Sequence, residues 1–221
     1  MNLSEAPTQR SAPSRRIHLA SRSPRRQQLL REHGLEFEAR HPGFEDSDLR
    51  PGRVTPPQWV AALAYLKAAA GLAQLDPRPR DEVPPIVLGA DTACVQGDRL
   101  IGTPRDAEEA REMIRSLRDG EHDVITGVAL IEPASGRRLL FADTARVEVG
   151  HLSDAQIEEY ILSGDWRGKA GAYNLSERLA AGWPIRYTGD PATVMGLPVR
   201  RLLRLLDRWP PGGADPKGAA A

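Results

Sequence analysis

The amino-acid sequence predicts an α/β fold with a mixed β-sheet flanked by helices. Short apolar runs that suit buried strands alternate along the chain with segments that carry helix caps and helical apolar spacing. Two further β-patterned runs, Val124–Ile131 and Leu139–Val149, are separated only by a turn near residues 133–136. Because so short a turn joins antiparallel strands, we expect the sheet to be mixed rather than purely parallel.

The first expected strand is Ile17–Ala20, a short apolar run that is followed directly by a helix. Ser23 suits the N-cap of this helix, Pro24 suits its first position, and Gly34 suits its end. A second helix is expected near Pro57–Leu75, where apolar residues recur at helical spacing and many are alanine.

The next strand is expected at Ile86–Ala90, which suits a strand that is buried on both faces. We expect this strand to end at Asp91 and Thr92. Asp106 then suits the N-cap of a helix, with Glu109 completing a capping box. The apolar stripe of that helix falls at i, i+3, i+4 and i+7, on Ala110, Met113, Ile114 and Leu117.

After the expected hairpin, Ser153 and Gln156 form a capping-box pattern for another helix, and Gly164 suits its end. A last helix is expected from Pro198. We therefore expect one domain over residues 17–207. Residues 1–16 and 208–221 are expected to be disordered tails, since they are rich in Ser, Pro and Arg or in Pro, Gly and Ala.

The composition excludes several functional classes. The 221 residues hold 30 Lys and Arg against 30 Asp and Glu, a balance that argues against a general nucleic-acid or membrane binder. No apolar run approaches the ~20 residues of a membrane span. The single cysteine, Cys94, has no internal disulfide partner, which fits a reducing compartment. The five histidines show no zinc-binding spacing.

The segment Ser21-Arg-Ser-Pro-Arg-Arg26 is a candidate anion site. Basic residues are locally unfavourable at a helix N-terminus, where the helix dipole and the free backbone N–H groups favour negative charge. That cost has a purpose if hydroxyls, N–H groups and the guanidinium groups of Arg25 and Arg26 converge on phosphate oxygens. The alternative is a capped surface helix with solvated arginines.

Three further positions are candidates, each with a structural alternative. Asp91 and Thr92 follow a buried strand, where a carboxylate can hold a divalent cation or act as a general base; the alternative is a turn cap. Lys67 lies on an alanine-rich helix and is either a cleft lysine or a snorkelling surface residue. Lys169 is bracketed by small residues that leave room for a ligand, or is a solvated lysine in a glycine loop.

Taken together, these stretches resemble the Maf family of nucleoside triphosphate pyrophosphatases, also described as septum formation inhibitor Maf-like proteins. The resemblance covers roughly residues 17–207, and the matching stretches occur in the family's order. They are Leu19–Leu30 (LASRSPRRQQLL), the Lys67 helix, Val87–Val95 (VLGADTACV), the Asp106 helix, His122–Leu130 (HDVITGVAL), Gly168–Tyr173 (GKAGAY) and Val194–Val199 (VMGLPV).

The resemblance implies two lobes around a central cleft, as in inosine triphosphatases. It implies hydrolysis of the α–β phosphoanhydride of nucleoside triphosphates, normal or modified, in nucleotide-pool housecleaning. It also implies a divalent metal cation (Mg²⁺ or Mn²⁺), a cytoplasmic location and a possible homodimer.

The resemblance also implies roles for individual residues. Asp91 matches the proton acceptor, and Thr92 matches a position linked to base choice. The phosphate-binding positions match Ser21, Arg25 and Arg26, and the cleft lysines match Lys67 and Lys169. Glu45 or Asp46 is a further candidate metal ligand; we take Glu45, together with Asp91, as the expected pair.

Two departures from the family pattern leave the substrate base open. Family members carry Gly-Lys-Pro after the Asp-Thr strand, whereas this chain has Thr103 at the lysine position. Ser176 stands where the thymidine/uridine branch carries a glutamine, and a serine reaches less far and offers a different hydrogen-bond set. These departures motivate two alternatives: a catalytically weakened nucleotide-binding regulator of cell division, and an interaction domain without a nucleotide site.

Overall fold

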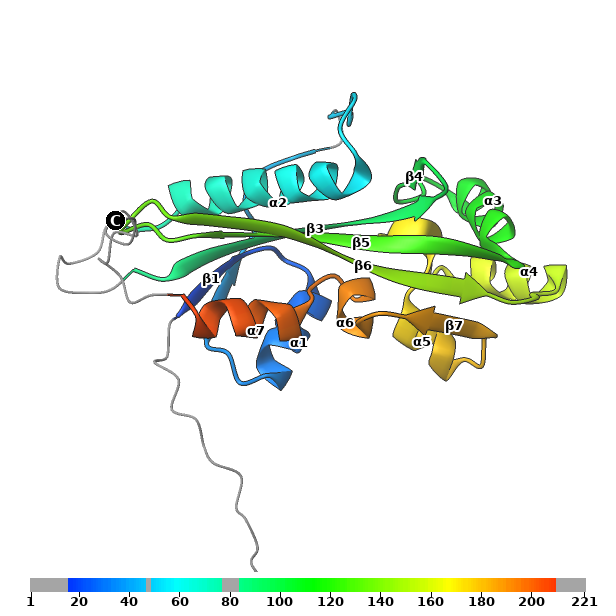
Figure 1. Ribbon diagram of the computed structural model, residues 1–221. Helices are drawn as coiled ribbons and strands as arrows, with labels where there is room; N and C mark the ends of the chain where they lie inside the picture. Colours follow the sequence, from blue (N-terminus) through cyan, green and yellow to red (C-terminus); the bar gives the residue numbers. More distant parts are fainter. Residues whose placement is uncertain (1–15, 47–48, 77–83, 210–221) are drawn as a thin grey trace, which may run out of the picture.

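The computed structural model describes residues 16–46, 49–76 and 84–209, and these ranges contain one seven-stranded sheet (Figure 1). The strand order is β2-β1-β3-β5-β6-β7, and β4 pairs with the far end of β3. The strands are β1 (Ile17–Ala20), β2 (Phe37–Arg40), β3 (Ile86–Gln96), β4 (Arg99–Ile101), β5 (Gly120–Ile131), β6 (Arg138–Val149) and β7 (Ile185–Thr188). Strands β2, β1 and β3 are mutually parallel and all other pairs are antiparallel, which confirms the predicted mixed sheet.

The helices cover both faces of the sheet. The long helix α2 lies along one face, while α1, α6 and α7 lie against the other (Figure 1). The helices α3 and α4 lie together at the end of the long strands that is far from β1 and α7. The helices are α1 (Pro24–Glu32), α2 (Pro56–Ala73), α3 (Ala107–Leu117), α4 (Asp154–Ser163), α5 (Leu175–Ala180), α6 (Pro191–Val194) and α7 (Val199–Asp207), with a 3₁₀ turn η1 (Ala170–Ala172). Among the described residues, no helix is both long enough and apolar enough to cross a bilayer.

The capping residues predicted from the sequence cap the helices that contain them. Ser23 and Asp106 accept hydrogen bonds from backbone N–H groups of α1 and α3, and Ser153 forms the predicted capping box of α4 with Gln156. The prediction of a capping box at α3 is wrong in one detail, because Glu109 accepts from the backbone N–H of Arg105 and not from that of Asp106. Glu109 also pairs with the Arg105 guanidinium, and this contact places its carboxylate beside Arg105 instead of beside the N-cap residue Asp106.

The strand that was expected to end at Asp91 and Thr92 continues to Gln96. Residues Val87–Val95 of β3 pair with β5 without interruption, so the polar Asp91-Thr92 pair lies inside the strand. The hydrogen-bonded ladder and the buried side chains of Cys94 and Val95 stabilise the extended backbone beyond it.

Helix α2 lies unusually close to the sheet because two glycines face it. A Cβ atom on Gly89 of β3 would lie 2.1 Å from the carbonyl oxygen of Ala64, and one on Gly127 of β5 would lie 2.3 Å from that of Val60. Real Cβ atoms do not approach other atoms so closely, so only glycine permits this contact. The close approach fixes the height of α2, and therefore of Lys67, above the sheet.

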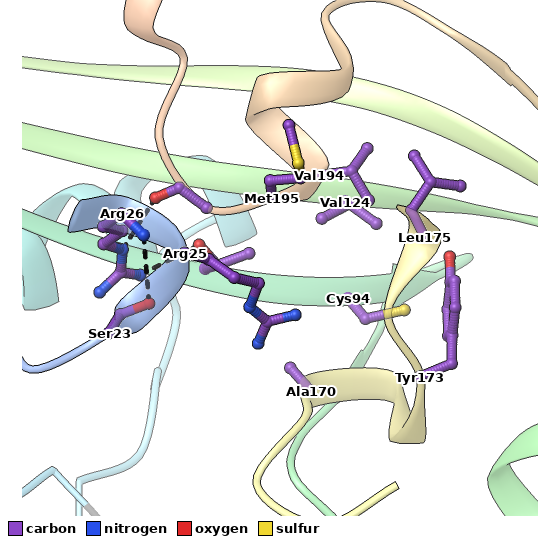
Figure 2. A pocket seen from close by; sticks show the side chains of 12 residues that line it. Ser23, Arg25, Arg26, Cys94, Val124, Ala170, Tyr173, Leu175, Val194 and Met195 are labelled. Carbon is purple, nitrogen blue, oxygen red and sulfur yellow. Dashed lines mark hydrogen bonds between the residues drawn. The ribbon is translucent and has the colours of Figure 1, made fainter. Parts of the chain in front are cut away.

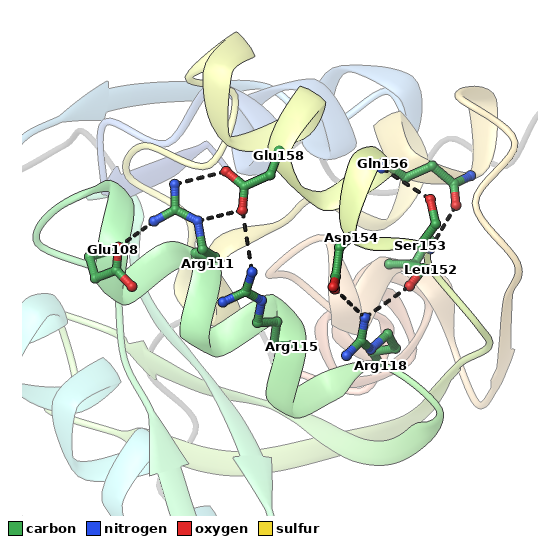
Figure 3. A network of polar contacts seen from close by, with 9 residues as sticks. All are labelled: Glu108, Arg111, Arg115, Arg118, Leu152, Ser153, Asp154, Gln156 and Glu158. Atoms are coloured by element: carbon green, nitrogen blue, oxygen red, sulfur yellow. Dashed lines mark hydrogen bonds and ion pairs between the residues drawn. The ribbon is translucent and has the colours of Figure 1, made fainter.

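Ion pairs join α3 and α4. The Arg111 guanidinium donates to both carboxylate oxygens of Glu158, at 2.6 and 2.9 Å, and also pairs with Glu108 (Figure 3). Arg118, at the end of α3, donates to Asp154 at 2.7 Å. These contacts supplement the apolar contact between the helices, to which Ile114 and Ile157 contribute.

The described domain extends slightly beyond the expected 17–207 boundary. Trp209 is only 6% exposed, belongs to the same apolar cluster as Leu202, and donates a ring N–H to Glu132. The backbone carbonyl of Arg16 accepts from Ile86 at the other end of the domain. The rest of both expected tails lies outside the described residues, and the division into two lobes stays a prediction.

Candidate active site

An open edge in the middle of β3 defines the candidate active site. The last residue of β3 that pairs with β1 is Leu88, and the first that pairs with β4 is Cys94. Between them, residues 89–93 have no strand partner on this edge within the described part of the chain. The loop that follows β1 lies beside this edge, and so does the N-terminus of α1. Ligands of α/β sheets bind where neighbouring strands end or diverge in this way.

A pocket opens between α1, β3, η1 and α6, with a volume of about 560 Å³ that includes the part open to solvent (Figure 2). Arg25, Arg26 and Thr92 line one part of it, so this part is polar and carries two positive charges. Uncharged side chains line the rest, namely Cys94, Val124, Ala170, Tyr173, Leu175, Val194 and Met195. The pocket thus offers a cationic end for an anionic group and a largely apolar end for a flat, uncharged one.

The Arg26 guanidinium is held by three neutral oxygens. It donates to the carbonyl of Gly196 at 2.8 Å, to the Ser21 hydroxyl at 3.2 Å and to the Thr92 hydroxyl at 3.2 Å. Burial lowers the pKa of Arg26, and the nearby charge of Asp91 acts in the opposite direction. Because none of these three acceptors carries a charge, the cation stays available to an anionic ligand.

Helix α1 adds its N-terminus to this cationic end. Ser23 is the N-cap, and its backbone N–H donates to the Ser21 hydroxyl at 3.1 Å. The same hydroxyl accepts from Arg26, so Ser21 orients the arginine. Arg25 extends from α1 into the space between α1 and Ala170 (Figure 2). The arginines predicted to gather at this N-terminus therefore do line one pocket.

A second polar cluster lies on the opposite face of β3. The Lys67 ammonium of α2 lies 2.5 Å from an Asp91 carboxylate oxygen and 2.7 Å from an Asp46 carboxylate oxygen. Lys67 and Asp91 are both largely buried, with side chains 17% and 13% exposed. One cation is thus shared by two carboxylates, and this cluster carries a net negative charge.

The two clusters are separated by the alternation of side chains along β3. Asp91 points toward α2, whereas its neighbour Thr92 points toward α1, because successive residues of a strand face opposite sides. The clusters adjoin at the open edge of residues 89–93. A ligand that lies across this edge can reach Arg26 from one side of the strand and Asp91 from the other.

Three of the predicted residues are not among those that line the pocket. The Lys169 ammonium is paired with Glu177, and the exposed Ser176 donates to Asn174 at 2.8 Å; neither residue lines the pocket. Glu45 is exposed, while its neighbour Asp46 approaches Lys67. Sequence reasoning placed Asp46 second to Glu45 because two adjacent acids on an irregular segment give no periodic signal for the direction of their side chains.

The apolar end of the pocket is backed by a buried His122–Tyr173 pair. The Tyr173 hydroxyl lies 2.7 Å from the His122 Nε2 atom, and the two rings meet edge to face. Burial lowers the pKa of His122 to about 4 and raises that of Tyr173. Burial also raises the pKa of the Cys94 thiol to about 12. At neutral pH all three groups are uncharged, so this end of the pocket carries no charge of its own.

The residues suit a metal ion that is held by few protein ligands, and the Asp46–Asp91 pair is the candidate for holding it. Within the described ranges, no group of three or more His, Cys, Asp and Glu side chains is arranged to hold one. Two carboxylates that approach the same ammonium are nevertheless close to each other. Mg²⁺ commonly binds through one or two carboxylates together with substrate phosphates and waters.

Comparison with known proteins shows the family of this chain. Residues 16–209 match the family Maf, described as Maf-like protein. The chain belongs to the Maf family. It is 38% identical over 193 residues to the dTTP/UTP pyrophosphatase of Pelotomaculum thermopropionicum, covering 87% of this chain and 96% of that protein. The protein of the same name from Salinibacter ruber is 40% identical over 188 residues, covering 85% and 88%. That from Geobacillus sp. is 38% identical over 196 residues, covering 88% and 98%.

Proposed function

We propose that this Maf-family chain is a nucleoside triphosphate pyrophosphatase, which hydrolyses the bond between the α- and β-phosphates to give a monophosphate and pyrophosphate. The observation that carries the proposal is the open edge of β3, with Arg25 and Arg26 on one side and Asp91 on the other. Its relatives named dTTP/UTP pyrophosphatase support the same reaction. No observation on the described residues favours the regulator or the plain interaction domain.

The polyphosphate binds at the cationic end of the pocket. Lys67 is already shared by Asp46 and Asp91, and Lys169 is paired with Glu177. Arg25 and Arg26 therefore supply the main uncompensated positive charge, and the N-terminus of α1 adds its partial charge. Guanidinium groups bind phosphate oxygens through two parallel hydrogen bonds, which fixes the orientation of the chain of phosphates.

Asp91 acts as the general base. It accepts a proton from a water molecule, which attacks the α-phosphorus. The bond from that phosphorus to the α–β bridging oxygen breaks, and its electron pair leaves with pyrophosphate. Lys67 holds the Asp91 carboxylate in place through its 2.5 Å contact. Arg25 and Arg26 stabilise the negative charge that develops on the departing pyrophosphate, an electrostatic contribution that is strengthened by burial.

We include a divalent cation, Mg²⁺ or Mn²⁺, in the proposal. Asp91 and Asp46 are its proposed protein ligands, in place of the Asp91–Glu45 pair expected from the sequence. When bound, it supplies positive charge to the phosphate oxygens.

The nucleobase is proposed to occupy the uncharged end of the pocket, between Tyr173 and Val194. Thymidine and uridine triphosphates are the first candidates because of the names of the relatives. Ser176 is turned toward Asn174 and leaves Leu175 to line the pocket, so modified bases belong in the test as well. A cytoplasmic location and a homodimer stay predictions.

The test is an assay of the purified chain with a panel of normal and modified nucleoside triphosphates plus Mg²⁺ or Mn²⁺, scoring pyrophosphate and monophosphate. Two analogues locate the cut. A triphosphate with a methylene group between the α- and β-phosphates should resist hydrolysis, whereas one with a β–γ methylene group should still release the monophosphate. If the panel yields no pyrophosphate, the proposed activity is wrong, and binding without turnover would favour the regulator.

Asp91→Asn tests the catalytic assignment. Loss of a general base is expected to lower kcat by about 10²- to 10⁴-fold. The matched control is Asp98→Asn, which makes the same chemical change at an exposed position in the turn after β3 and should leave kcat unaltered. Near-wild-type turnover in Asp91→Asn would remove Asp91 from the mechanism.

A further inference from the structure

Thr126 carries a fully buried hydroxyl that the proposed reaction does not use. It lies in the stretch HDVITGVAL on β5, directly opposite Thr92 of β3, and its exposure is 0%. Its hydroxyl oxygen lies 2.9 Å from that of Thr92 and 2.7 Å from the carbonyl oxygen of Thr193. It is not among the residues that line the pocket.

The direction of each hydrogen bond around Thr126 follows from which atoms can donate and which can only accept. A carbonyl oxygen only accepts, so the single hydroxyl hydrogen of Thr126 is donated to Thr193. Thr126 therefore accepts at its contact with Thr92, and Thr92 is the donor there. With its hydrogen used in this way, the Thr92 oxygen presents a lone pair to the Arg26 guanidinium.

These contacts close into a ring that contains the phosphate-binding arginine. Arg26 donates to Thr92, Thr92 to Thr126, and Thr126 to the backbone of Thr193. Three residues later, the carbonyl of Gly196 accepts from the Arg26 Nε atom at 2.8 Å. The ring spans α1, β3, β5 and the segment that begins with α6, so it holds these elements together at the cationic end of the pocket.

The ring is anchored outside the pocket as well. The Thr193 hydroxyl donates to one oxygen of Asp143 at 2.6 Å, and the other oxygen of Asp143 accepts from Arg201 of α7 at 3.1 Å. The position of the Thr193 carbonyl is thus set by β6 and α7, independently of any ligand. A hydroxyl that donates to so fixed an acceptor has one orientation.

We infer that Thr126 is a positioning residue of the active site, whose hydroxyl sets the orientation of the Thr92 hydroxyl and through it that of Arg26. This inference rests on the proposed function, because it assigns the positioned arginine to the triphosphate. If Thr126 cannot accept, the Thr92 hydrogen loses its acceptor and its fixed direction, so the lone pair that Thr92 presents to Arg26 is no longer held in one orientation.

The test compares Thr126→Val with Thr126→Ser in steady-state kinetics on the best triphosphate of the panel. Valine has nearly the same shape but no hydroxyl, and a hydrogen bond of this kind is worth about three- to tenfold in binding. We expect KM to rise by this factor and kcat to fall as well, because Arg26 binds phosphate in the ground state and, in the proposed mechanism, also stabilises the charge that develops on the leaving group. Thr126→Ser should restore KM, since it restores the hydroxyl.

Val128→Ala is the matched control. Val128 is also fully buried on β5 and faces the same side of the sheet, but it packs in an apolar cluster and does not itself line the pocket. It should lower the urea midpoint without raising KM. The inference is overturned if Thr126→Val keeps the wild-type KM, if serine fails to restore it, or if Val128→Ala raises KM equally.

A spectroscopic readout separates this inference from the proposed function. The Arg26 Nε–H that donates to Gly196 should give a slowly exchanging signal in the ¹H–¹⁵N spectrum, identified by its loss in Arg26→Lys. We expect exchange of this signal to accelerate in Thr126→Val and not in Thr126→Ser. If the wild type releases no pyrophosphate, the proposed function fails. An unchanged signal in Thr126→Val overturns the positioning role by itself.

Discussion

The Gly89→Ala substitution tests whether the Lys67–Asp91 contact depends on the close approach of α2 to the sheet. The new Cβ atom would lie 2.1 Å from the Ala64 carbonyl oxygen and 2.7 Å from the Ala68 nitrogen. Cβ atoms keep at least 3.0 Å from such neighbours, so the helix and β3 must separate by the difference, at least about 0.9 Å. Both obstacles are backbone atoms of α2 and have no rotamer through which to move aside.

The expected loss follows from that displacement. Overpacking costs about 1–3 kcal/mol, and a clash with backbone belongs at the upper end of that range. With a urea slope of about 2 kcal/mol per molar, a loss of about 3 kcal/mol lowers the unfolding midpoint by about 1.5 M. Lys67 lies in the turn of α2 that is displaced, so we also expect kcat/KM to fall by up to about 100-fold.

The assay is urea denaturation followed by circular dichroism, alongside Gly102→Ala as the control. A Cβ atom on Gly102 would meet no atom within 4 Å, and its backbone is not in the left-handed region. That substitution should be neutral or stabilising by up to about 1 kcal/mol. If Gly89→Ala unfolds at the same urea concentration as Gly102→Ala, the argument that glycine sets the height of α2 is wrong.

Two further predictions follow from the buried histidine and from the ion pairs between α3 and α4. Burial holds the pKa of His122 at about 4 in the folded chain, against 6.5 in the unfolded one, so protonation favours unfolding as the pH falls below 6.5. We expect protonation of His122 to lower the free energy of unfolding by about 2 kcal/mol between pH 7 and pH 5. The His122→Gln variant should therefore lose less stability than the wild type over that interval, and an equal loss in both proteins would contradict this assignment. Glu158→Gln removes the bidentate contact with Arg111 and should lower the urea midpoint at low salt, with a smaller difference from wild type at about 1 M salt. A difference that does not depend on salt would show that packing, and not charge, joins the two helices.

Local signals in the sequence predicted the elements whose ends are set by their own residues. Ser23, Asp106 and Ser153 cap helices as expected because a cap is a contact between residues two or three apart. The strands β2, β4 and β7 have three or four residues each and were not predicted. Strand β1 is equally short but is a mostly apolar run, whereas these three strands mix charged and apolar residues and carry no clear pattern. Their extended backbone depends on pairing with other strands of the sheet.

The site was predicted in its residue types more than in its geometry. Arg25, Arg26 and Thr92 line one pocket, and Asp91 pairs with Lys67, while the roles assigned to these residues stay predictions. Because the strand was expected to end at Asp91 and Thr92, the alternation of a continuing strand was not applied to these two residues. The separation of the two residues onto opposite faces therefore appears only in the structure.

This separation explains how opposite charges coexist in one small site. If Asp91 faced α1, its carboxylate would meet the Arg26 guanidinium, and the resulting ion pair would compete with a phosphate for the same hydrogen-bond donors. The strand instead directs Asp91 to Lys67 and leaves Arg26 to three neutral oxygens. Burial lowers the pKa of Arg26, and the charge of Asp91 across β3 offsets part of that lowering. The arginine is thereby oriented but not neutralised. An anion that lies across the open edge would complete the charge balance on one side of the strand and reach Asp91, the proposed base, on the other.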